Sequence, residues 1–180
     1  DTGDLAWVDD DGFVHLCGRA KDLIIRGGHN IDPALIEDAL LAHPDVTGVA
    51  AVGRPDVHSG EVPVAYVTLR PDSAVTPDSL RQWAAQHVAE SAAAPKSVIA
   101  IDAIPVTAVG KPYKLPLRAD AARSAVRDAL AAVPGVDDVE AAVDDGAIVV
   151  TIVVGADTDT DADAAILGRY ALAWDIKERS

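Results

Sequence analysis

The chain has 180 residues, with 15 basic and 29 acidic side chains and a formal net charge of −14 at pH 7. This charge argues against binding to nucleic acid or to an anionic membrane surface, because both require a cationic stripe on the protein. The length suits one ordinary domain plus an appendix and is short for a complete enzyme that joins two substrates, so we expect a part of a longer chain.

The sequence contains few signals for cellular location or for metal binding. We expect a soluble, cytoplasmic protein without a membrane span, because the sequence shows no basic-then-apolar leader and no apolar run of transmembrane length. The single cysteine, Cys17, excludes an internal disulfide and fits a reducing compartment. No metal site is expected, since the five histidines and Cys17 form no His-x-x-x-His or Cys-x-x-Cys pair.

The first elements are short and apolar, and they predict strands at residues 5–8, 13–17 and 23–25. Asp9 to Gly12 is a turn signal between the first two runs, so we expect a hairpin there. Residues 26–30 are expected to form a loop, because Gly27 and Gly28 can take backbone angles that are closed to other residues.

The middle of the chain alternates between helices and strands. Asp32 before Pro33, and Thr76 before Pro77, each predict an N-cap followed by proline at the first helical position. We expect further strands at residues 49–52, 62–69 and 97–101, with a loop at residues 53–61. The fold class is therefore α/β (α+β), with a small open three-stranded sheet covered mainly on one face by two helices.

Beyond Arg118 the pattern starts again as an acidic α-β-β-α extension. We expect a helix at residues 119–133, a hairpin at 136–154 and a last helix from about residue 162 to residue 177. Residues 119–180 contain 13 of the 29 acidic side chains and 5 of the 15 basic ones, which makes them an unlikely phosphate site. The aspartate run at 157–163 lacks the glycine and closing glutamate of a calcium loop, so we interpret it as a solvated linker.

The segment from Pro105 to Lys114 places the pair Gly110-Lys111 after a hydrophobic strand. A lysine is cationic at neutral pH, and its compact charge suits a phosphoryl oxygen whose negative charge grows during a reaction. From composition alone, a surface lysine that follows a strand remains the alternative.

The order of short motifs along the chain favours the phosphate-binding interpretation of Lys111 over a surface lysine. The motifs are Thr2-Gly-Asp-Leu5, Asp11-Gly-Phe13, the run from Gly18 to Ile31, Ile36-Glu37, His43-Pro44, Gly53-Arg-Pro-Asp56, Gly60-Glu61 and the run from Pro105 to Lys111. Together they resemble the C-terminal part of the adenylate-forming, AMP-binding enzymes, which include acyl-CoA synthetases, adenylation domains of peptide synthetases and firefly-type luciferases. The resemblance covers residues 1 to about 118, and residues 23–31 and 107–114 look most like fatty-acyl-CoA synthetases.

The resemblance implies a ligase that uses ATP and CoA as substrates, with Mg²⁺ expected in the full enzyme and no ligands for it in this part. It implies the end of the large N-terminal domain at residues 1–20, a mobile C-terminal domain at 21–118 and the extension at 119–180. Carried over by position, it implies ribose binding by Asp4 and Arg19, a hinge at Lys21, a passage for the pantetheine arm of CoA at Gly27, Gly28 and His29, and an adenylation lysine at Lys111.

We therefore expect a fragment of an acyl-CoA synthetase that is inactive alone, whose partners are the missing N-terminal domain of the same chain and a fatty or other carboxylic acid. A departure is Pro112, which follows the lysine and should stiffen the loop. Two alternatives remain at this point. One is an adenylation module that loads a carrier protein, although residues 119–180 contain no Gly-Gly-x-Ser attachment motif. The other is a non-catalytic interaction module in which residues 119–180 dock or form a homodimer.

Overall fold

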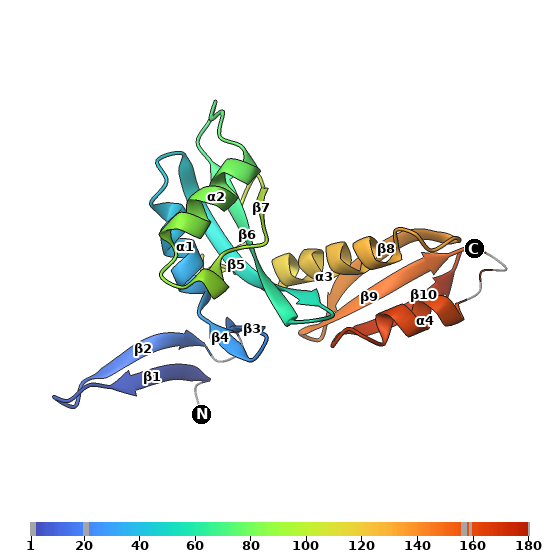
Figure 1. Cartoon of the computed structure of the whole chain (residues 1–180), viewed down its shortest axis with the longest axis horizontal. Coiled ribbons are helices and arrows are strands. Elements are labelled where there is room, and N and C mark those ends of the chain that lie inside the picture. Colours follow the sequence, from blue (N-terminus) through green and yellow to red (C-terminus); the bar gives the residue numbers. More distant parts are fainter. Residues whose placement is uncertain (1–2, 20–21, 156–157, 159, 180) are drawn as a thin grey trace. The chain divides into compact units, whose positions relative to one another are not determined.

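The structure, a computed structural model, describes every residue except 1–2, 20–21, 156–157, 159 and 180 (Figure 1). The chain divides into two compact units. The first unit consists of Asp1–Gly53 and Val62–Ile104, and the second of Arg54–Glu61 and Pro105–Ser180. The boundaries expected at residues 20 and 118 stay predictions.

The chain begins with the expected hairpin. Strands β1 (Asp4–Val8) and β2 (Val14–Arg19) pair antiparallel. Asp9 closes the turn between them, because its Oδ1 accepts the backbone N–H groups of Asp11 at 3.1 Å and Phe13 at 2.8 Å. A short side chain that bonds to the backbone just ahead of it is a common way to stabilise such a turn.

The main sheet, most of which lies in the first unit, has five strands rather than the three expected from the sequence. They are β3 (Ile24–Arg26), β4 (His29–Ile31), β5 (Val46–Asp56), β6 (Gly60–Leu69) and β7 (Ser97–Ala100). The order is β4-β3-β6-β5, and β7 pairs parallel with β6. The sheet is open, as predicted, and it is mixed, because β3 and β4 pair antiparallel whereas β6 and β7 pair parallel.

Two expected loops are shorter than the sequence indicated, and this accounts for the longer strands. Gly27 and Gly28 have φ values of 57° and 85°, which allows a two-residue turn, and Arg26 then pairs directly with His29. At the other loop, Asp56 Oδ1 accepts the N–H groups of His58 at 3.0 Å and Ser59 at 2.8 Å. This tight turn lets β5 continue to Asp56 and β6 start at Gly60.

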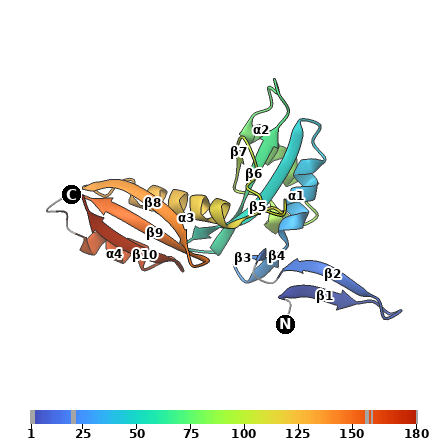
Figure 2. The same cartoon turned by 180° about the vertical axis from the view of Figure 1, so that it is seen from behind.

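Both helices of the first unit start where their caps predicted. Helix α1 (Pro33–Leu41) is capped by Asp32, whose side chain accepts the Ala34 N–H at 2.9 Å. Helix α2 (Pro77–His87) is capped by Thr76, and Thr76 and Ser79 bond to each other's backbone N–H groups as a capping box. Figures 1 and 2 show both helices on the same face of the sheet.

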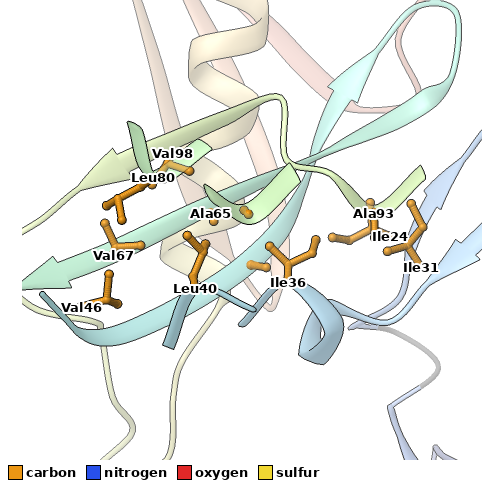
Figure 3. Packing of buried hydrophobic residues seen from close by; sticks show 12 residues of the cluster. Ile24, Ile31, Ile36, Leu40, Val46, Ala65, Val67, Leu80, Ala93 and Val98 are labelled. Atoms are coloured by element: carbon orange, nitrogen blue, oxygen red, sulfur yellow. The ribbon is translucent and has the colours of Figure 1, made fainter. Parts of the chain in front are cut away.

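The core of the first unit lies between these helices and the sheet. Figure 3 shows side chains from β3, β4, α1, β6 and α2 meeting in one cluster. Its largest members, Ile24, Ile31, Ile36, Leu40 and Leu80, have no solvent exposure. A short 3₁₀ turn, η2 (Ser91–Ala93), closes the end of this core near β4 and contributes Ala93. Burial of these apolar side chains is the main term that holds the sheet and helices together.

The second unit builds its own core on a three-stranded sheet. Its elements are α3 (Leu115–Leu130), β8 (Val136–Asp144), β9 (Ala147–Val154), α4 (Asp161–Leu167) and β10 (Ala173–Glu178). Strand β9 is central, antiparallel to β8 and parallel to β10. Buried side chains of α3, β8, β9 and α4 form a single cluster. The Arg54 guanidinium pairs with Asp128 of α3 and also reaches the Ser124 carbonyl oxygen at 3.4 Å.

The expected α-β-β-α order of this unit was incomplete, because the last helix ends at Leu167 and a strand follows. In β10 the half-buried Trp174 and Ile176 alternate with the exposed Asp175 and Lys177. This period of two suits a strand with one covered face and not the helix that we expected up to residue 177. Helix α3 also begins at Leu115, a turn earlier than expected.

Candidate functional site

Residues 105–113, called here the Lys111 loop, form a closed hairpin-like turn. Val106 and Pro112 make an antiparallel bridge, and the Tyr113 N–H donates to the Pro105 carbonyl at 2.7 Å. Inside this frame the Thr107 N–H donates to the Lys111 carbonyl at 2.7 Å, and the Gly110 N–H donates to the Thr107 carbonyl at 2.8 Å. Gly110 has a φ of 77°, which glycine adopts without strain.

Lys111 stands at the end of this turn, and its side chain is exposed. No described residue forms an ion pair with its ammonium group, which leaves the charge available to an incoming anion. The loop also carries exposed apolar side chains, with Val106 at 58%, Val109 at 79% and Tyr113 at 37% exposure. A cation inside an apolar exposed loop is suited to a contact that water leaves on binding, because the electrostatic attraction strengthens as the local dielectric falls.

Two predicted site residues meet in the first hairpin. Asp4 of β1 and Arg19 of β2 are directly opposite each other in the strand register, at the open end of the hairpin. Lys21, the predicted hinge, lies outside the described residues.

The Gly27–Gly28 turn joins β3 and β4 and is exposed, as is His29. A Cβ atom placed on either glycine would meet no heavy atom within 4 Å. The positive φ values, and not internal crowding, therefore require glycine here. The open space beside the backbone is what a thin flexible ligand needs to pass close to the main chain.

Arg26 holds this turn in place, and the sequence did not single it out. Its Nη1 donates to the Ala92 carbonyl oxygen of η2 at 2.7 Å, across 66 residues of sequence. The bond is partly buried and charge-assisted, and such bonds are stronger than those between neutral groups. Arg26 thus ties the hairpin to the segment that closes the core of the first unit.

The structure groups the predicted residues without uniting all of them. Asp4 and Arg19 share one hairpin, and Gly27, Gly28 and His29 share the next. Lys111 belongs to the second compact unit and these five to the first.

The described residues include no group of three or more His, Cys, Asp or Glu side chains that could hold a metal ion, so no magnesium ligand is assigned. No helix within the described ranges is long and apolar enough to cross a membrane.

Residues 35–111 match the family model described as the AMP-binding enzyme C-terminal domain. This part of the chain belongs to that family. The match begins inside α1 and ends at Lys111, so it includes most of α1, all of α2 and strands β5, β6 and β7 of the sheet described above. Within the AMP-binding C-terminal domain, Lys111 is the last matched residue.

Relatives of the AMP-binding domain match a longer part of the chain than the family model does. A marinolic acid–CoA ligase from Pseudoalteromonas sp. is 48% identical over 131 residues, which is 73% of this chain and 20% of the relative. A medium/long-chain-fatty-acid–CoA ligase from Mycobacterium tuberculosis is 40% identical over 124 residues, 66% of this chain and 22% of the relative. Among solved structures, o-succinylbenzoate CoA synthetase from Bacillus subtilis in complex with its acyl-adenylate intermediate is 35% identical with a TM-score of 0.59, and the match covers 65% of this chain and 24% of that one. The chain thus spans between a fifth and a quarter of the length of these relatives.

Proposed function

We propose that this chain is the C-terminal part of an ATP-dependent acyl-CoA synthetase. In the first half-reaction a carboxylate oxygen bonds to the α-phosphorus of ATP, and the bond from that phosphorus to pyrophosphate breaks. In the second, the CoA thiolate bonds to the acyl carbon, and AMP leaves. The observation that carries the proposal is Lys111, an exposed cation at the end of a hydrogen-bonded turn, in a chain whose relatives are named CoA ligases.

Lys111 would serve the first half-reaction. Charge accumulates on the α-phosphate oxygens as the carboxylate attacks, and a fixed ammonium group lowers the energy of that state more than it lowers the energy of the bound substrates. The loop geometry supports this role, because the turn fixes the backbone of Lys111 while no described residue neutralises its side chain. Asp4 would accept hydrogen bonds from the ribose hydroxyls, with Arg19 opposite it in the hairpin.

The Gly27–Gly28 turn would serve the second half-reaction. Both glycines and His29 are exposed, and the space where side chains would stand is open. A pantetheine arm could therefore run beside the backbone towards the acyl-adenylate. The domain would turn about Lys21 between the two half-reactions and present Lys111 first and the glycine turn second.

The remaining parts of the proposal concern the rest of the enzyme. The acyl pocket and most of the ATP site would lie in an N-terminal domain, so this chain alone would not turn over substrate. The names of the relatives support a fatty or other carboxylic acid as substrate and CoA as acceptor. We also propose a cytoplasmic enzyme, with residues 119–180 available for homodimer contacts through the edges of the β8–β10 sheet.

The test uses the full-length enzyme that carries this chain. With ATP, CoA and a panel of fatty and aryl acids it should form acyl-CoA, AMP and pyrophosphate, while residues 1–180 alone should form none. Lys111→Ala should lower adenylation about 100-fold or more and leave thioester formation from preformed acyl-adenylate unchanged. Lys177→Ala, which removes an exposed lysine of β10, is the matched control and should change neither. Equal loss of both half-reactions in the Lys111 variant would contradict its assignment.

A further inference from the structure

We propose that Thr107 is a positioning residue for Lys111: its hydroxyl holds the lysine backbone in the conformation that adenylation requires. Thr107 Oγ1 accepts the backbone N–H of Lys111 at 3.1 Å. The inference rests on the proposed function, because the value of a fixed Lys111 lies in the reaction that this lysine serves.

The hydroxyl fills a gap in the hydrogen bonding of the loop. In a regular two-stranded turn the Lys111 N–H would donate to the Thr107 carbonyl, since the Thr107 N–H already donates to the Lys111 carbonyl at 2.7 Å. Here the Thr107 carbonyl is taken by the Gly110 N–H at 2.8 Å. The threonine hydroxyl serves as the acceptor for the Lys111 N–H in place of the Thr107 carbonyl, and this completes the ring between residues 107 and 111.

The hydrogen bonds among Thr107, Gly110 and Lys111 matter because the rest of the loop does little to restrict its own backbone. Ala108, Val109 and Gly110 are exposed, and Gly110 has the broad backbone freedom of a glycine. On the other side of Lys111, Pro112 has a φ angle fixed by its ring, and it makes the bridge to Val106. Thr107 and Pro112 thus restrain Lys111 from both sides. Electrostatic catalysis depends on such restraint, because a charge that must first be ordered stabilises the transition state less.

The test compares Thr107→Val, which keeps the shape and removes the hydroxyl, with Thr107→Ser, which keeps the hydroxyl. In the full-length enzyme we expect the valine variant to lower the kcat of adenylation about 10-fold, measured as carboxylate-dependent exchange of pyrophosphate into ATP. The serine variant should stay near the wild-type rate. Both variants should form thioester from preformed acyl-adenylate at the wild-type rate, because that step does not use Lys111.

A second measurement reports the hydrogen bond without reference to activity. Amide hydrogen exchange of the peptide that contains Lys111 should be faster in the valine variant than in wild type, and unchanged in the serine variant. Equal exchange in all three proteins would overturn the proposal, because the hydroxyl bond would then not close the loop. Faster exchange with unchanged adenylation would overturn it too, as would equal losses in the valine and serine variants. A wild-type enzyme without adenylation activity would instead refute the proposed function, and the role of Thr107 would fall with it.

Discussion

The Gly27–Gly28 turn and the Lys111 loop solve the same problem of chain reversal in different ways. The first uses two glycines with positive φ and strands in direct register, and no side chain of the turn itself takes part. The second uses one such glycine and closes through the threonine hydroxyl. The first leaves bare backbone next to open space, whereas the second presents a charged side chain from a restrained position.

In the proposed function, this difference separates a loop that lets a ligand pass from a loop that delivers a charge. A turn that must let a ligand pass needs the absence of side chains, and its anchor can lie outside it, as Arg26 does. A loop that must deliver one charge needs internal restraint, because every free backbone torsion of the loop weakens preorganisation of the charge that it carries. Variants of the Gly27–Gly28 turn and variants of the Lys111 loop should therefore slow different half-reactions.

The largest effect is expected when the anchor of the glycine turn is removed. Arg26→Met keeps an unbranched apolar side chain but removes the guanidinium, which leaves the Ala92 carbonyl without its 2.7 Å donor. We expect the β3–β4 hairpin to open more easily by about 2 kcal/mol, since hydrogen bonds to charged groups contribute that order of free energy. Amide hydrogen exchange of residues 24–31 in the chain would measure this opening free energy.

Arg70→Met is the matched control for that variant. Arg70 Nε donates to the Pro44 carbonyl at 2.6 Å, so the same chemistry is removed at an exposed site away from the hairpin. Exchange of residues 24–31 should not change in this control. If Arg70→Met loosened the hairpin as much as Arg26→Met does, the anchor role of Arg26 would be wrong.

A smaller effect is expected when a methyl group is added to the glycine turn. Gly28→Ala should cost about 1 kcal/mol of stability, because alanine is strained at a φ of 85°. No heavy atom lies within 4 Å of the added Cβ, so the new methyl group meets no internal obstacle and occupies the proposed passage. Thioester formation from preformed acyl-adenylate should fall about 10-fold, with adenylation preserved.

Gly110→Ala provides the reciprocal variant in the Lys111 loop. Its φ of 77° gives the same backbone strain, and its Cβ site is equally open. We expect adenylation to fall by several-fold and thioester formation to persist, measured in the same two assays. Should both glycine variants slow the same half-reaction, the division of labour between the two loops would be refuted.

The sequence predicted the parts of the fold that local chemistry determines. Asp32 and Thr76 mark helix starts because a cap bonds within three residues, and the structure confirms both. Strand β10 was missed, because its pairing with β9 is parallel and lies across a helix, so no nearby turn signals it. The short turns at Gly27–Gly28 and Asp56 were read as longer loops, since glycine and aspartate mark a reversal without giving its length.

The residues of the candidate site likewise divide into those that the sequence could indicate and those that it could not. Lys111 and the glycine pair were placed by resemblance to a family, and no periodic pattern in the chain would have selected them. Arg26 was out of reach, because its partner lies 66 residues away. Thr107 could have been found, since a threonine four residues before Lys111 in a glycine-containing turn is a possible local acceptor for its N–H.

The smallest effect is expected at Asp9. Asp9 closes the first hairpin through a side-chain oxygen, as Thr107 closes the Lys111 loop. Unlike the threonine hydroxyl, the carboxyl group of Asp9 can titrate. Its hydrogen bond with His15, at 2.6 Å, and the bond from the Phe13 N–H hold the pKa of Asp9 below its ordinary value of 3.8. Because the folded pKa is the lower one, the stabilisation is complete above the ordinary value and is lost as pH falls through the folded pKa. The Phe13 amide chemical shift in the chain should therefore change on acidification below about pH 4, while the Lys111 amide, bonded to a hydroxyl, should not. Asp9→Asn should abolish the change at Phe13, and a Lys111 amide that followed the same titration would contradict the contrast between the two closures.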